Sequence, residues 1–194
     1  MSSKVPYAYL DTNVILDVIR GRKPESISLM EKVREGKIKA CTSGFTFLEL
    51  LDKEQEYALV WKMLKDGYSF DAILKKRSER NLNDKELDEC FRKMDSTFTM
   101  QYKKHMDFYY LSDAGWDKAV ELMHKLNLTS NDALHLATAI MAGCDLMVSS
   151  DQNLLENAEK VIKVSTPETI DKLLATISKE NPLRKLTVAS LKDF

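Results

Sequence analysis

Four acidic residues stand where a parallel β-sheet would bring side chains together. Asp11 directly follows a short apolar segment, and Asp151 follows the apolar segment 146–148 after two serines. Glu49 lies about a turn and a half into a predicted helix, and Asp132 lies in the first turn of another. Because ligands bind at the carboxyl ends of the strands in open parallel sheets, these four carboxylates could form one site.

Such a site would suit one kind of chemistry. Carboxylates crowded together without cations repel one another, and clusters of them occur where hard divalent ions take oxygen ligands. A set of oxygen ligands without His or Cys favours Mg²⁺ or Mn²⁺ over zinc. One or two of these ions can ionise a water and stabilise an in-line phosphoryl transition state. The expected substrate is therefore a phosphodiester.

Each acid also has an ordinary structural explanation. Asp132 would interact favourably with a helix dipole, Asp151 could cap a turn or helix, and Glu49 could be a solvated helix residue. Phosphatases of the haloacid-dehalogenase type require a second Asp two residues after the Asp that follows the first strand. This chain has Asn13 at that position. Response-regulator receivers want adjacent acids near the first strand, and the chain has none there. Only the coincidence of four acids at one sheet edge favours a functional site.

The elements that would position these acids alternate between strand and helix. The apolar patterns predict strands in the segments 6–10, 38–42, 107–111, 146–148 and 161–164. Helices are predicted at 14–19, 24–35, 43–51, 55–65, 70–80, 85–104, 113–126, 129–142 and 167–177. This alternation predicts an α/β fold with a parallel sheet and helices on both faces.

Length and composition exclude several classes of protein. A chain of 194 residues can bury a core without disulfides or a structural metal. Its 29 Lys and Arg against 30 Asp and Glu exclude a polybasic nucleic-acid coat, although not a local basic groove. Three cysteines far apart, without a CxxC pattern, indicate reduced thiols in a cytoplasm. No apolar run could span a bilayer, so we expect a cytoplasmic protein without membrane contact.

Four blocks of sequence together resemble a known family. They are 9–16 (YLDTNVIL), 43–50 (SGFTFLEL), 130–139 (SNDALHLATA) and 148–151 (VSSD). The chain resembles PIN-domain proteins, and among these the VapC-type toxins of toxin–antitoxin pairs. The resemblance implies a three-layer α/β/α fold and a Mg²⁺- or Mn²⁺-dependent ribonuclease. It also implies that the family's catalytic, metal-binding acids are Asp11, Glu49, Asp132 and Asp151.

Three further residues are candidates for supporting roles. Asn13 falls on the small polar residue that supports the first acid in the family, and Ser149 falls on a hydroxyl position two before the last acid. His135 shares a helix face with Asp132, so it could shuttle protons, contact phosphate, or support the acids from the core. Asn153 stands where some family members carry a further Asp.

The resemblance covers about 1–52 and 107–175 and leaves the rest to be explained. We expect a single PIN-like domain over 1–194, with a mainly helical insertion at about 54–106 and a C-terminal extension at about 180–194. The insertion could clamp RNA, form part of a dimer, or cover the site. The implied partners are an RNA substrate, a second copy in a homodimer, and an antitoxin protein. The alternative is a non-catalytic PIN-fold module that binds RNA or a protein, against which the presence of all four acids counts.

Overall fold

The computed structural model describes residues 5–77, 79 and 81–179. Within these residues a parallel sheet of five strands has the order β3-β2-β1-β4-β5. The strands are β1 (Tyr7–Leu10), β2 (Lys39–Ser43), β3 (Asp107–Tyr109), β4 (Leu146–Val148) and β5 (Lys163–Ser165). The predicted C-terminal extension at 180–194 lies outside the described residues.

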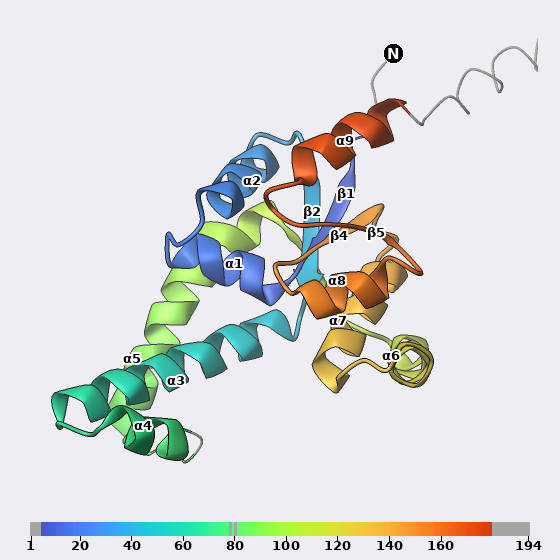
Figure 1. Ribbon diagram of the computed structural model, residues 1–194. Coiled ribbons are helices and arrows are strands. Elements are labelled where there is room, and N and C mark those ends of the chain that lie inside the picture. The colour runs from blue at the N-terminus through green and yellow to red at the C-terminus, as the bar shows by residue number, and fades with distance from the viewer. Residues whose placement is uncertain (1–4, 78, 80, 180–194) are drawn as a thin grey trace, which may run out of the picture.

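The sheet is the middle one of three layers (Figure 1). Successive side chains of β1 point to opposite faces, so Ala8 and Leu10 enter one core and Tyr9 enters the other. The first core contains side chains of α1 (Thr12–Ile19), α2 (Pro24–Arg34) and α9 (Ile170–Lys179). The second contains side chains of α6 (Asp113–Leu126), α7 (Ser130–Met141) and α8 (Gln152–Ala158). The three-layer α/β/α fold is thus confirmed. No helix of the described part combines the length and apolar character needed to cross a membrane.

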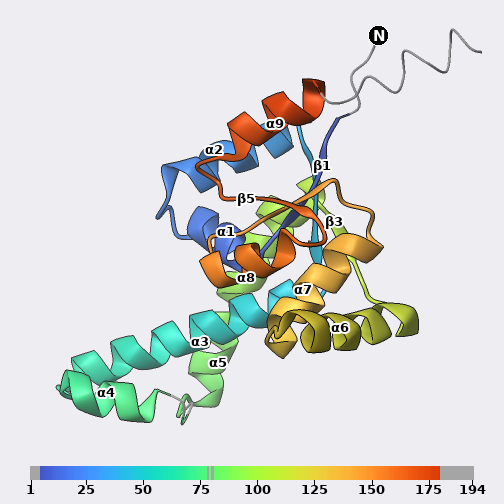
Figure 2. The same cartoon turned by 45° about the vertical axis from the view of Figure 1, so that its right-hand side comes forward.

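Three helices project together from the sheet and form an arm (Figures 1 and 2). They are α3 (Thr46–Lys65), α4 (Phe70–Lys76) and α5 (Asp84–Met94). The arm has a small core of its own around Leu59, Met63 and Ile73, separate from the two cores of the sheet. The first two turns of α3 lie against the main core, where Leu50 is buried and Phe47 and Leu51 pack against it. One helix therefore runs from the sheet into the arm.

Two helical segments differ from the prediction. The helices expected at 43–51 and 55–65 are one continuous helix, α3, since no Gly or Pro interrupts residues 46–65. The long helix expected at 85–104 is α5 followed by a π-helical segment, η1 (Asp95–Tyr102), and a 3₁₀ turn, η2 (Lys103–His105). The wider π turn keeps Met94, Phe98 and Tyr102 on one face, buried in the main core. The end of the segment 54–106 therefore packs into the main core beside the sheet.

Candidate active site

Asp11 lies at the carboxyl end of the central strand. Its backbone N–H donates to the Val148 carbonyl at the end of β4, 3.0 Å away. Its carboxylate caps α1 by accepting from the Thr12 N–H at 2.7 Å. The residue is only 5% exposed. The strand–Asp–helix order in the sequence thus buries a carboxylate at the point where β1 and β4 end.

A hydroxyl and an amide orient this carboxylate. The Ser149 hydroxyl donates to Asp11 Oδ2 at 2.6 Å, and Asn13 Nδ2 donates to Ser149 Oγ at 3.0 Å. The Asn13 carbonyl oxygen accepts from the Ser150 N–H at 3.0 Å, and Ser149 Oγ also accepts from the Asp151 N–H at 2.9 Å. Asn13 and Ser149 therefore join the α1 end of the site to the loop after β4.

Glu49 connects three helices. Its Oε2 contacts His135 Nε2 of α7 at 2.6 Å and accepts a hydrogen bond from the Thr12 hydroxyl of α1. Its Oε1 accepts from Asn131 Nδ2 at 3.2 Å. The carboxylate of α3 is thereby held beside Asp11 by groups from both neighbouring helices.

His135 lies between the two carboxylates. It is 3% exposed, and its Nε2 is 3.8 Å from Asp11 Oδ1 as well as 2.6 Å from Glu49. Its Nδ1 is in hydrogen-bond contact with the Tyr9 hydroxyl at 2.5 Å. Burial lowers the pKa of the imidazole, but the hydrogen bond with Glu49 and the nearby carboxylate charges outweigh burial and raise it. The two carboxylates therefore favour the protonated form of His135, which could not be predicted from the sequence.

The pKa values of Asp11 and Glu49 are shifted in opposite directions. Burial raises the pKa of Asp11, and the His135 charge and the hydrogen bond from Ser149 only partly oppose it. Burial also raises the pKa of Glu49, but the hydrogen bond and charge of His135, with the Thr12 hydroxyl, bring it below its ordinary value. The Glu49–His135 pair thus favours its charged form, whereas the more deeply buried Asp11 is more easily protonated.

Asp132 and Asp151 flank this group without touching it. The Thr129 hydroxyl donates to Asp132 Oδ2 at 2.7 Å, and the Asp132 charge contributes to the raised pKa of His135 one turn later. Asp151 caps α8 by accepting from the Leu154 N–H at 3.1 Å. The structure thus gathers Asp11 and Glu49 around one imidazole, while Asp132 lies in the first turn of α7, which Thr129 caps, and Asp151 caps α8.

The donor set suits a hard cation by type. The four acids and the hydroxyls behind them offer oxygen ligands, which Mg²⁺ and Mn²⁺ prefer. Within the described residues, however, no three His, Cys, Asp or Glu side chains are gathered as a group that could hold a metal ion. The metal role of Asp11, Glu49, Asp132 and Asp151 therefore stays a prediction that rests on the chemistry of the donors.

A shallow cleft of about 510 Å³ adjoins the acids. The residues that line it are Asn13, Asp17, Arg22, Lys23, Ser150 and Asp151. The Lys23 ammonium donates to the Ser150 hydroxyl at 3.3 Å. Both cations also pair with the buried carboxylate of Asp17, at 2.6 Å for Arg22 and 3.8 Å for Lys23. Two cationic side chains, both paired with carboxylates, therefore lie beside the loop that carries Asp151.

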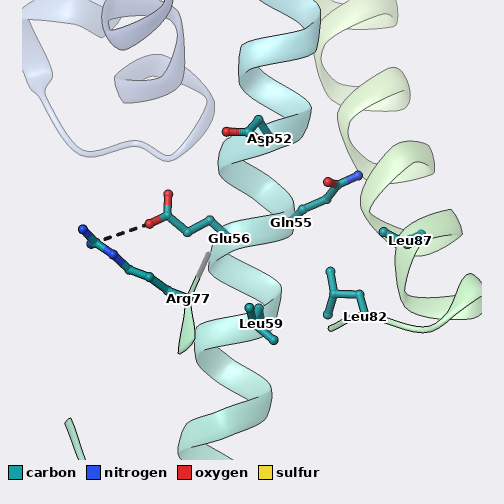
Figure 3. A pocket seen from close by; sticks show the side chains of 7 residues that line it. All are labelled: Asp52, Gln55, Glu56, Leu59, Arg77, Leu82 and Leu87. Atoms are coloured by element: carbon teal, nitrogen blue, oxygen red, sulfur yellow. Dashed lines mark ion pairs between the residues drawn. The ribbon is translucent and has the colours of Figure 1, made fainter. Parts of the chain in front are cut away.

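A second pocket, of about 270 Å³, lies on the arm and away from the acids (Figure 3). Leu59, Leu82 and Leu87 form its apolar side. Glu56 and Arg77 pair at 3.7 Å on its polar side. It contains none of the predicted site residues.

Several residues of the site were not predicted from the sequence. Thr12, Asn131 and Tyr9 complete the hydrogen bonds of Glu49 and His135, and Thr129 holds Asp132. Thr12 and Asn131 directly follow or precede a predicted acid, which is the only sequence signal for them. Tyr9 looked like an ordinary strand residue, and its role depends on which helix covers β1.

Part of the chain is similar to a known domain family. Residues 92–160, which include Asp132, His135 and Asp151, match the family model of the PIN domain. The chain is PIN-like. A chain of a toxin–antitoxin complex from Klebsiella pneumoniae is similar in fold, with a TM-score of 0.51 at 15% identity, over 82% of this chain and 97% of that one.

Two other solved structures are similar at lower scores. One is FitAB bound to an IR36 DNA fragment, at 14% identity and a TM-score of 0.49, over 82% of this chain and 94% of that one. The other is VapBC2 from Rickettsia felis bound to a DNA fragment from their promoter, at 15% identity and a TM-score of 0.47, over 82% and 98%. A search of curated protein sequences gave no match.

Proposed function

We propose that this PIN-like chain is a metal-dependent endoribonuclease that hydrolyses RNA phosphodiester bonds. The observation that carries the proposal is the buried Asp11 carboxylate at the carboxyl end of the central strand, facing Glu49 across His135. Placement at this end of a parallel sheet is typical of a ligand site. PIN domains are generally nucleases, which supports hydrolysis as the reaction.

The side chains of the site have separable tasks. Asp11, Glu49, Asp132 and Asp151 would hold Mg²⁺ or Mn²⁺, which when bound ionises a water and offsets charge on the phosphodiester. Ser149 and Asn13 fix the direction of the Asp11 carboxylate. His135, whose pKa the neighbouring carboxylates raise, would offset part of the charge of Asp11 and Glu49 when it is protonated.

The basic residues of the neighbouring cleft would position the substrate. Arg22 and Lys23 line this cleft together with Asp151, where they would pair with phosphates next to the scissile one. Because these contacts are to the sugar–phosphate backbone, they give affinity without choosing a base sequence.

The first prediction concerns the reaction and its products. Purified protein should cleave RNA with Mn²⁺ or Mg²⁺, and EDTA should abolish cleavage. The product ends should be 5′-phosphate and 3′-hydroxyl, because water attacks and not the ribose 2′-hydroxyl. End-labelling of the products with and without phosphatase treatment measures this. A 2′,3′-cyclic phosphate would contradict the proposed mechanism, and RNA binding without cleavage under any metal would favour the non-catalytic module.

We also propose an antitoxin and a second copy of the chain as protein partners. The similarity in fold to a chain of a toxin–antitoxin complex supports the antitoxin. A homodimer follows from the family resemblance. Light scattering of the purified chain, alone and with the product of the neighbouring gene, would measure both states.

A further inference from the structure

Two cysteine thiols lie against each other under α7. Cys41 is on β2, in register with Tyr9 of β1, and Cys144 is in the turn between α7 and β4. Their Sγ atoms are 3.2 Å apart, in hydrogen-bond contact, although 103 positions separate them in the chain. This contact could not be predicted from the sequence, because only the order of the strands brings the two cysteines together.

The two thiols differ in their access to solvent. Cys41 is completely buried, whereas Cys144 is only partly buried. The third cysteine, Cys90, is buried on α5, where its Sγ contacts the Glu54 carbonyl at 3.9 Å. A reagent in solution therefore meets Cys144 before either of the others.

The two thiols also differ in acidity. Hydrogen bonds from the Cys144 thiol and the Tyr7 hydroxyl lower the pKa of Cys41 against the effect of its burial. The hydrogen bond to Cys41, together with burial, raises the pKa of Cys144. Cys41 is thus the readier thiolate of the pair, and it is held next to the sulfur that solvent can reach.

We propose that Cys41 and Cys144 form a redox-active dithiol that reacts with low-molecular-weight disulfides and closes to an internal disulfide. Cys144 Sγ gives its proton to the Cys41 thiolate, 3.2 Å away, and attacks one sulfur of the external disulfide, whose S–S bond breaks and releases one thiolate. Cys41 Sγ then loses its proton and attacks Cys144 Sγ, which releases the second thiolate. Two protein thiols are oxidised, and one external disulfide is reduced to two thiols.

The new bond would join two segments of the candidate active site. It would tie β2, which leads into the helix of Glu49, to the turn after α7, the helix of Asp132 and His135. The link passes across β1, which Asp11 directly follows. Oxidation would therefore link β2 covalently to the turn after α7, the two segments next to the helices that carry Glu49 and His135. The proposal does not depend on the nuclease activity.

Oxidised glutathione and the full-length chain test the proposal. After treatment the protein should have lost the mass of two hydrogen atoms, with a Cys41–Cys144 linked peptide and Cys90 still open to alkylation after denaturation. The melting temperature should rise by about 10 °C, because the link closes a loop of about 100 residues, and dithiothreitol should reverse the rise. Cys90→Ser should behave like the wild type.

Two variants separate the roles of the sulfurs. Cys41→Ala should stop at a stable mixed disulfide on Cys144, and Cys144→Ser should not react, since Cys41 is buried. Melting curves of the reduced variants check that each is folded. If the wild type keeps glutathione on Cys144 without closing, or if both thiols remain free after treatment, the proposal is wrong. Both of these outcomes are read from the peptide map of the wild type. The test of the proposal therefore does not depend on whether a variant folds.

Discussion

Asp11→Asn should abolish metal-dependent RNA cleavage while the fold stays intact. Asparagine keeps the shape of the side chain but removes the charge of the most deeply buried of the four acids. Losing even a group that only supports a metal ligand typically costs about 10–100-fold in activity or metal affinity. We therefore expect Asp11→Asn to lower the cleavage rate by more than about 100-fold. Ser149→Ala removes only the supporting hydroxyl, so it should lower the rate by about 10–100-fold.

The controls for this prediction come from the same chain. Asp71→Asn makes the same change on the exposed first turn of α4, so it should cleave at the wild-type rate. Initial rates across a Mn²⁺ titration give the loss, and circular dichroism shows whether each variant is folded. In EDTA, Asp11→Asn should melt no lower than the wild type, because the raised pKa means that the buried carboxylate is costly to ionise. If Asp11→Asn cleaves RNA at the wild-type rate, Asp11 is not part of the catalytic site.

The second large effect concerns stability without metal. The pKa of His135 is raised in the folded chain, so its contribution is full below the unfolded value of about 6.5 and is lost as pH rises through the folded value. The pKa of Glu49 is lowered, so its contribution is present above about 4.5 and is lost as pH falls through the folded value. The pair therefore stabilises the fold most between about pH 4.5 and 6.5.

His135→Gln tests this pair, because glutamine is polar but cannot take up the proton. Breaking a buried ion pair typically costs about 3–5 kcal/mol, and we expect about 3 kcal/mol at pH 6 and a smaller loss at pH 8. Urea unfolding in EDTA at both pH values measures the difference. His124→Gln, at an exposed position on α6, is the matched control. Equal losses at pH 6 and pH 8 would show that His135 acts by packing and not by charge.

The sequence predicted the sheet better than it predicted the helices. The five strands fall within a few residues of their predicted places, because each is a short apolar segment beside turn residues. The seven-residue helix α8 was not predicted, since it is too short for a clear periodic pattern. The π-helical turn of η1 was not predicted either, because its shape depends on burying Phe98 and Tyr102 against the sheet.

The same limit applies to the candidate site. Asp11 could be placed from the sequence because it directly follows the central strand. The position of His135 between Asp11 and Glu49 could not be predicted, because it depends on how α7 packs over Tyr9. The expectation of a cluster of bare negative charges was incomplete for this reason. The sequence does not distinguish a buried histidine that pairs with carboxylates from one that only packs in the core.

The small core of the arm divides the chain into regions of unequal local stability. Leu59, Met63 and Ile73, with Val60 and Leu82 beside them, bury far less apolar surface than the cores of the sheet. Local opening therefore costs less free energy in the arm than around β1. Helix α3 belongs to both regions, with Glu49 in its first turns and Leu59 and Met63 further along. A ligand that orders the arm thus also restrains the helix on which Glu49 stands, so occupancy of the arm and order at the acids are thermodynamically linked.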